Sequence, residues 1–296
     1  RVNEHFANEL SKVVLPSDLL WVHDYHFIPL GDELRKRGLT NRIGFFLHVP
    51  FPAPEFMTVL PHHERLLSSL LQYDLIGFQT EGDVQNFIRY VISEHPGSNI
   101  GVFQATNRQV VLNQNDRQIR VGAFPVGVDT VEFEKRARLA ARSSFVKKAV
   151  ESLDGRTLMI GVDRLDYSKG LTQRMEAVDL FFSNRPDWRG KVIYLQIAPK
   201  SRSEIQEYQE LGQALGAVAG RINGKFGEVA WTPIRYVNRA YSRTELAGLY
   251  RSARVGLITP LRDGMNLVAK EYVAAQDAGD PGVLILSRFA GAAAEC

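Results

Sequence analysis

Short apolar runs alternate with longer stretches of helical spacing along almost the whole chain. Strands are expected at 19–22, 42–47, 75–78, 110–112, 118–124, 158–162, 192–197, 234–237, 255–258 and 283–286. Helices are expected at about 30–37, 55–71 and 83–92, and between the strands of the second half. Polar residues between 112 and 118 suggest a hairpin there. This alternation predicts an α/β protein with parallel sheets covered on both faces.

A basic amphipathic stretch at 131–150 separates the two series of strands. A chain of 296 residues is long enough for about two domains of roughly 150 residues each. We place the boundary near Phe133, after the turn-forming segment 125–129, which gives domains at 1–133 and 134–296.

The most informative segment is 161–171, which follows an apolar strand directly. Ser168 is a suitable cap for a helix that runs on through Met175, so Arg164 and Lys169 fall in a strand-to-helix loop. Open α/β sheets bind ligands at this end of their strands. Two cations beside a helix start favour a phosphate or diphosphate. The alternative is a surface ion pair between Arg164 and Asp163 or Asp166.

A second anion site is predicted at 262–271. Gly264 allows a tight turn before a helix from about Met265 to Gln276, whose first amides have no internal partner. Glu271 lies four residues after Leu267 and leans back toward the helix start, where it could accept bonds from ribose hydroxyls. The alternative is a solvated pair of Glu271 with Lys270 or Arg262. The nearby Arg164 and Lys169 loop favours the ligand-binding interpretation.

Polar groups follow five different predicted strands directly, which suggests one cleft between two facing domains. They are His23 to His26, His48, Arg164 with Lys169, Lys200 with Arg202, and Arg262 to Gly264. The spacing of His23, Asp24 and His26 is unlike an established ligand set, so we expect no metal.

Composition excludes several further classes of function. A net charge of +3 without a run of five Lys or Arg argues against nucleic-acid binding. No apolar stretch approaches the roughly 18 residues of a membrane span. No secretory signal is recognisable, and the single cysteine, Cys296, fits a reducing cytoplasm. No G-x-G-x-x-G follows a strand, which argues against a dinucleotide dehydrogenase. The chain starts without methionine and stops after a strand, so we expect a piece of a longer protein.

With these residues in view, the chain closely resembles the trehalose-6-phosphate synthases, retaining glycosyltransferases of the two-domain GT-B fold. The resemblance covers nearly all 296 residues. It rests on W-V-H-D-Y-H (21–26), F-F-L-H-V-P-F-P (45–52), G-V-D-R-L-D-Y-S-K-G-L (161–171), I-A-P-K-S-R (197–202), R-I-N-G-K-F-G (221–227) and P-L-R-D-G-M-N-L-V-A-K-E (260–271).

The resemblance implies a role for each matching residue. Catalytic roles fall to Arg164, Lys169, His48 and Asp263, with Arg164 and Lys169 on the diphosphate of UDP-glucose and His48 and Asp263 on the glucose hydroxyls. Tyr241 would lie beside the nucleotide, and the segment Met265, Asn266, Leu267, Val268, Ala269, Lys270 and Glu271 would complete the donor site. Asp24 and Arg202 would contact glucose 6-phosphate, Arg202 at its phosphate.

The implied reaction joins UDP-glucose and glucose 6-phosphate into trehalose 6-phosphate and UDP, in trehalose biosynthesis and osmoprotection. No cofactor is implied, since UDP-glucose is a substrate, and an assembly of identical chains stays open. The first domain would be the acceptor side, and it lacks the family's early arginine and its Gly-Gly loop. The alternatives are a glucosylglycerol-phosphate synthase, a C–N-joining pseudo-glycosyltransferase, another nucleotide donor, or a non-catalytic sugar-phosphate-binding module.

Overall fold

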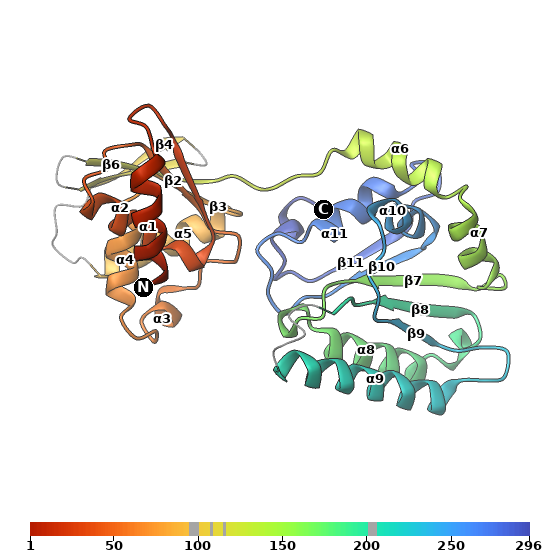
Figure 1. The fold of residues 1–296 in the computed structure, drawn as a ribbon. Helices are drawn as coiled ribbons and strands as arrows, with labels where there is room; N and C mark the ends of the chain where they lie inside the picture. The colour runs from red at the N-terminus through yellow and green to blue at the C-terminus, as the bar shows by residue number, and fades with distance from the viewer. Residues whose placement is uncertain (95–100, 107–108, 115–116, 201–205) are drawn as a thin grey trace. The chain divides into compact units, whose positions relative to one another are not determined.

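The computed structural model describes residues 1–94, 101–106, 109–114, 117–200 and 206–296 (Figure 1). The chain divides into two compact units, Arg1–Val126 and Gly127–Cys296. We call them the N-terminal unit and the C-terminal unit. Each has its own sheet and its own apolar core, as the GT-B prediction requires; the sheet of the C-terminal unit is parallel, and that of the N-terminal unit is mostly parallel.

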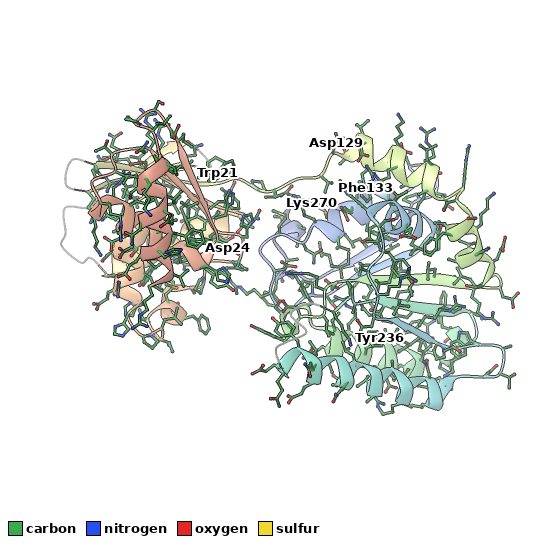
Figure 2. The ribbon with its side chains drawn as sticks, in the orientation of Figure 1. Trp21, Asp24, Asp129, Phe133, Tyr236 and Lys270 are labelled. Atoms are coloured by element: carbon green, nitrogen blue, oxygen red, sulfur yellow. The ribbon has the colours of Figure 1, made fainter. Side chains whose placement is uncertain are left out.

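The division falls earlier than the predicted boundary near Phe133. Helix α6 (Thr130–Ala140) packs against two helices of the C-terminal unit, and Phe133 on α6 is fully buried in that unit's core (Figure 2). A boundary after Phe133 would cut through this helix. The correct boundary lies in the extended segment before it, between Val126 and Gly127.

The N-terminal unit contains a six-stranded sheet in the order β1-β2-β3-β6-β5-β4. The first four of these are parallel, and β5 runs antiparallel to both β6 and β4. The strands are β1 (Leu20–His23), β2 (Ile43–Phe46), β3 (Leu75–Phe78), β4 (Gly101–Thr106), β5 (Gln109–Gln114) and β6 (Arg117–Ala123). The predicted hairpin is therefore confirmed as β5 and β6, whereas β4 was not predicted.

The helices of this unit follow the predicted pattern with one correction. They are α1 (Val2–Val13), η1 (Tyr25–Phe27), α2 (Leu30–Lys36), α3 (Pro54–Met57), α4 (His63–Leu70) and α5 (Glu81–Glu94). The single helix expected over 55–71 is wrong. It is split into α3 and α4 because Pro61 lacks an amide hydrogen and His62 takes the left-handed conformation at φ 59°.

The C-terminal unit contains a five-stranded parallel sheet in the order β11-β10-β7-β8-β9. All five strands predicted for this half are confirmed: β7 (Thr157–Val162), β8 (Val192–Ile197), β9 (Ile234–Val237), β10 (Val255–Ile258) and β11 (Val283–Leu286). Their near-continuous Val, Ile and Leu content is typical of strands buried on both faces.

Helices cover both faces of this sheet, with α8 and α9 along one and α6, α10 and α11 along the other (Figure 1). Besides α6, they are α7 (Ser144–Glu151), η2 (Tyr167–Lys169), α8 (Leu171–Asn184), η3 (Pro186–Trp188), α9 (Gln206–Phe226), α10 (Arg243–Ser252), α11 (Leu267–Ala275) and η4 (Gly291–Ala294). Among the described residues, every helix is too short or too polar to span a membrane.

Candidate functional site

The strand order of the C-terminal unit contains a switch point beside β7. The chain moves from β7 to β8 and β9 on one side and then returns to β10 on the other. Helices therefore leave β7 and β10 toward opposite faces of the sheet, and in open α/β sheets ligands bind in the crevice at such a point. The two segments singled out from the sequence are the loops that follow β7 and β10.

An ion pair joins these two loops directly. Lys169 Nζ lies 2.6 Å from Asp263 Oδ2, and both side chains are largely buried. Asn266 Nδ2 donates to the same carboxylate oxygen at 2.9 Å. Asp263 therefore holds the lysine at the crevice before any ligand arrives.

The backbones of the two loops are also in close contact. Leu261 N donates to Ser168 O at 2.8 Å. Gly170 has φ 63°, and a Cβ at this position would lie 2.7 Å from Thr259 O. Glycine is needed here both for its conformation and for this close approach.

Arg164 is exposed at the end of β7, and among the described residues its guanidinium has no hydrogen-bond or ion-pair partner. The alternative of a surface ion pair is wrong, because both carboxylates are otherwise engaged. Asp163 Oδ2 pairs with Arg174 at 2.6 Å. Asp166 Oδ1 accepts bonds from the amide and hydroxyl of Ser168. The guanidinium of Arg164 is thus available to an anion.

Ser168 does not cap a helix, contrary to the prediction. It lies in the short turn η2, and Asp166 caps that turn through the Ser168 amide. Helix α8 begins only at Leu171, after the left-handed Gly170. The prediction failed because the loop forms a separate turn before the helix.

The second predicted anion site starts two residues later than expected. Met265 is buried and precedes the helix, and Asn266 is the N-cap, with φ 80° and its side chain accepting from Ala269 N. The amides of Leu267 and Val268 then have no possible intrahelical acceptor. The side chains of Ala269 and Lys270 are buried.

Glu271 lies on α11 and is engaged by a residue that the sequence did not suggest. Arg243 Nε donates to Glu271 Oε1 at 3.2 Å; Lys270 instead pairs with Glu295. Burial raises the pKa of the Glu271 carboxyl, and the Arg243 guanidinium opposes this rise. The carboxylate keeps acceptor capacity for hydroxyl groups.

Tyr241 precedes α10 and packs on Phe145 with ring centroids 5.5 Å apart. Both line a mostly apolar cavity of about 200 Å³ that also includes Ile197 and Leu249. A larger hollow of about 550 Å³ lies near the amino ends of β7, β8 and β9. It is lined by Arg156, Arg235 and Tyr236, among others. The geometry gives Tyr241 an apolar environment suited to a flat ring.

In the N-terminal unit, Asp24 follows β1 (Figure 2) with a backbone that L-residues rarely adopt, at φ 71° and ψ 163°. His48 N donates to Asp24 Oδ1 at 3.4 Å. His48 Nε2 lies 3.0 Å from His23 Nδ1, within hydrogen-bond distance. Such a strained backbone costs about 1–3 kcal/mol and is concentrated at functional sites.

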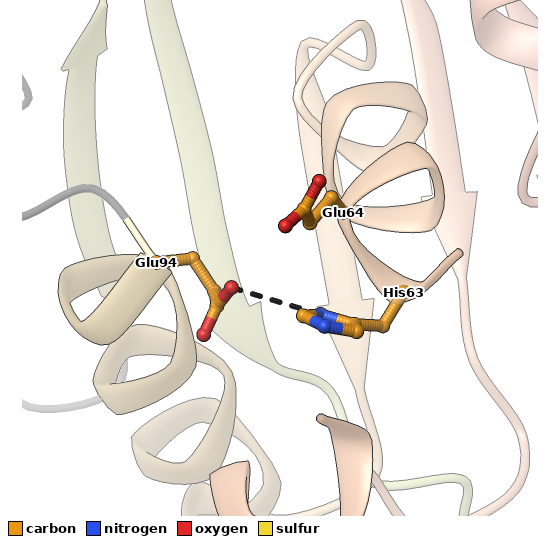
Figure 3. A group of neighbouring side chains, drawn as sticks. All are labelled: His63, Glu64 and Glu94. Carbon is orange, nitrogen blue, oxygen red and sulfur yellow. Dashed lines mark ion pairs between the residues drawn. The ribbon is translucent and has the colours of Figure 1, made fainter. Parts of the chain in front are cut away.

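Two further predictions concern Arg202 and metals. Arg202 lies outside the described residues. Within the described ranges, one group of three side chains could hold a metal ion: His63, Glu64 and Glu94 (Figure 3). His63 Nδ1 already bonds Tyr90 Oη at 2.8 Å and lies 3.7 Å from Glu94. These contacts join His63 to Tyr90 and Glu94 on helix α5.

The sequence analysis missed Arg174, which is more buried than any other charged residue in the described part of the C-terminal unit. A signal was present in the sequence. Leu171, Met175, Val178 and Phe182 form the apolar stripe of α8, and Arg174 lies on the same stripe. A charge on a buried helix face needs a partner, which here is Asp163 at the end of β7.

Known proteins resemble the chain over its whole length. A family model described as glycosyltransferase family 20 matches residues 1–296. A trehalose-6-phosphate synthase of Sinorhizobium fredii is 52% identical over 295 residues, which cover 100% of this chain and 62% of that protein. A second one, from an Enterobacter species, is 46% identical, with 100% and 60% covered.

Solved structures of trehalose-phosphate synthases are also similar to this chain. The UDP-forming trehalose-phosphate synthase of Burkholderia xenovorans in complex with glucose-6-phosphate is 45% identical with a TM-score of 0.94, covering 100% of this chain and 65% of that one. An E. coli structure bound with UDP-2-fluoro glucose is 43% identical with a TM-score of 0.90, covering 100% and 64%. The chain thus spans less than two thirds of the length of these relatives.

Proposed function

The chain belongs to glycosyltransferase family 20, and on that premise we propose that its protein transfers glucose from UDP-glucose to glucose 6-phosphate with retention. The products are trehalose 6-phosphate and UDP. The single observation that carries the proposal is the group of anion-binding elements at the switch point of the C-terminal unit: Arg164, Lys169 and the first amides of α11.

The C-terminal unit binds the donor. Arg164 and Lys169 hold the diphosphate, and the amides of Leu267 and Val268 add the positive end of a helix. Glu271 accepts the ribose hydroxyls. The apolar cavity beside Tyr241 suits the base. Relatives support this assignment, since the E. coli structure is bound with a UDP-glucose analogue.

The chemistry needs stabilisation of the leaving group above all. The bond between C1 and the phosphate oxygen breaks ahead of acceptor attack, and negative charge develops on that oxygen. Lys169 then turns from Asp263 toward the diphosphate, which frees the carboxylate for glucose hydroxyls. One preorganised donor of this kind contributes about 3–4 kcal/mol to transition-state stabilisation. The departing phosphate takes the proton of the acceptor hydroxyl, on the same face of the sugar.

Asp24 and Arg202 bind glucose 6-phosphate, and His48 binds the donor glucose. A relative in complex with glucose-6-phosphate supports this acceptor. The remaining acceptor groups belong to the part of the relatives' length that this chain does not span. The positive charges of Arg164 and Lys169 make a metal ion unnecessary. The cysteine content, a single Cys296, supports a cytoplasmic location.

Two measurements test the proposal. Calorimetry on the 296-residue chain is expected to detect UDP binding, with a higher but still measurable Kd in Lys169→Ala. The protein at its relatives' full length is expected to release UDP from UDP-glucose only when glucose 6-phosphate is present, with or without EDTA. Faster release with glycerol phosphate or another acceptor would replace the proposed acceptor. UDP-glucose binding without any product would indicate a non-catalytic binding module.

A further inference from the structure

Arg174 is a charged side chain that the proposed chemistry does not use, although its whole side chain is buried. It lies in the first turn of α8, within hydrogen-bond distance of both loops of the donor site. Figure 1 shows α8 along one face of the sheet. Burying a guanidinium is costly unless each nitrogen finds a partner.

Each of the three guanidinium nitrogens has a partner on an element of the crevice. Nη1 pairs with Asp163 Oδ2 at 2.6 Å and Gln196 Oε1 at 3.1 Å. Nη2 donates to the carbonyl of Lys169 at 3.2 Å. Nε donates to Thr259 Oγ1 at 3.0 Å. One planar group therefore links β8 to both loops.

Further buried groups complete this network. Gln196 Nε2 donates to the carbonyl of Gly161 at 3.2 Å, and its Oε1 accepts a bond from the Tyr194 hydroxyl. Burial raises the pKa of Tyr194 to about 12, so this hydroxyl stays protonated and donates. A Cβ on Gly161 would lie 2.6 Å from the same hydroxyl. The network is thus packed without spare volume.

Stability alone is a weak reason for such a network. Replacing a buried ion pair by apolar residues of similar volume is often neutral or stabilising. A planar guanidinium does something that an apolar group cannot do. It fixes the direction of several acceptors at once, here the Lys169 carbonyl and the Thr259 hydroxyl.

We propose that Arg174 is a positioning residue of the donor site. It holds the loop after β7 against the loop after β10, so that Lys169 and Asp263 face each other across the crevice before the diphosphate binds. It touches no ligand and acts through Lys169. This inference rests on the proposed function, because it takes Lys169 to be a phosphate-binding group.

The first test is a UDP titration of the 296-residue chain by calorimetry, with circular dichroism and a thermal melt for each variant. Arg174→Met is expected to weaken UDP binding at least tenfold in folded protein. Arg174→Lys restores the charge beside Asp163 but cannot reach both loops, so binding should recover only in part. In a Lys169→Met background, Arg174→Met should have little further effect on binding.

A matched control lies in the N-terminal unit. Arg35 also bridges several partners: Asp74 at 2.8 Å and the carbonyls of Leu39, Asn41 and Gln72. Arg35→Met should lower the melting temperature and leave the Kd for UDP unchanged. A loss of UDP affinity in this control would mean that the effect of Arg174 is general destabilisation, and the inference would fail.

A milder variant covers the case in which Arg174→Met does not fold. Thr259→Val keeps the buried ion pair and removes only the link from Nε to the second loop. It should weaken UDP binding about twofold to fivefold, corresponding to about 0.4–1 kcal/mol. Unchanged binding in folded Thr259→Val or Arg174→Met, or additive effects of Arg174→Met and Lys169→Met, would overturn the inference. Failure of the unmodified chain to bind UDP would instead refute the proposed function.

Discussion

The two units hold their candidate residues in different ways. In the C-terminal unit, Lys169 and Asp263 lie at a topological switch point, on two loops that a buried guanidinium joins. In the N-terminal unit, Asp24 and His48 follow the edge strand β1 and its neighbour, and Asp24 has a strained backbone. In the C-terminal unit, a buried polar network fixes the candidate side chains before a ligand binds. In the N-terminal unit, Asp24 is instead held in a strained backbone conformation.

This difference has a physical consequence. A buried network resists displacement because every broken bond leaves an unsatisfied polar group in a low dielectric. A strained residue is held only by its neighbours and relaxes when they change. We therefore expect substitutions in the donor loops to have coupled effects on binding. We expect substitutions of the acceptor-side residues Asp24 and His48 to have independent effects.

The largest expected effect is on the rate of glucose transfer when Arg164, the exposed cation of the donor loops, is replaced. Arg164→Ala in the protein at its relatives' full length should lower kcat about 10²–10³-fold, since it removes a charge beside the leaving oxygen. Binding of glucose 6-phosphate should be nearly unchanged. Arg185→Ala, which removes an exposed arginine beyond α8, is the control and should leave kcat unchanged. Near-normal turnover from Arg164→Ala would contradict the role given to this residue.

The next effect concerns the packing of the buried network. Gly161→Ala forces a methyl group against Tyr194 and Gln196, so it should lower the free energy of unfolding by about 1–3 kcal/mol. Gly216→Ala is the matched control. Its Cβ meets open space on α9, and it should be stabilising by up to about 1 kcal/mol. Chemical denaturation measures both; a stable Gly161→Ala would mean that the network is loosely packed.

Relief of strain should act in the opposite direction in the N-terminal unit. Asp24→Gly suits φ 71° and should raise the free energy of unfolding by about 1 kcal/mol, after the entropy cost of glycine. It should also weaken binding of glucose 6-phosphate, because the carboxylate is lost. Asp154→Gly relieves φ 51° at an exposed turn without changing binding. Unaltered affinity in Asp24→Gly would remove Asp24 from the acceptor site.

The smallest effect is a pH dependence at α11. Burial raises the pKa of Glu271 above 4.5. On acidification, this carboxylate should therefore become protonated at a higher pH than an ordinary glutamate does. Its protonation should weaken UDP-glucose binding a few-fold. A raised carboxyl pKa contributes stability that is present below 4.5 and is lost as pH rises through the folded value. Stability and donor affinity should therefore change in opposite directions.

Calorimetry across this pH range checks that effect, since the diphosphate diester keeps its charge. Glu271→Gln should flatten the profile. Arg243→Met should move the midpoint to higher pH, because Arg243 is the charge that opposes the rise of the pKa. A profile that Glu271→Gln leaves unchanged would assign the titration to another group.

The sequence by itself determined the α/β class, every described strand except β4, and the two loops that carry Arg164, Lys169 and Asp263. Local periodicity is enough for this, because strands buried on both faces and amphipathic helices leave a direct pattern. The same local rules misplaced the start of α8 at Ser168 and the boundary at Phe133. In both places a nonlocal contact decides, namely the approach of Gly170 to Thr259 and the packing of α6 on α10.

Only the tertiary structure decided which charges pair and which stay free. From sequence, Arg164 could have paired with Asp163 or Asp166, and Glu271 with Lys270 or Arg262. The fold gives Asp163 to Arg174 and Glu271 to Arg243, and it leaves Arg164 exposed. Ion pairing depends on distances of a few ångströms between residues far apart in the chain, and such distances exist only once the sheet has brought β7, β8 and β10 together.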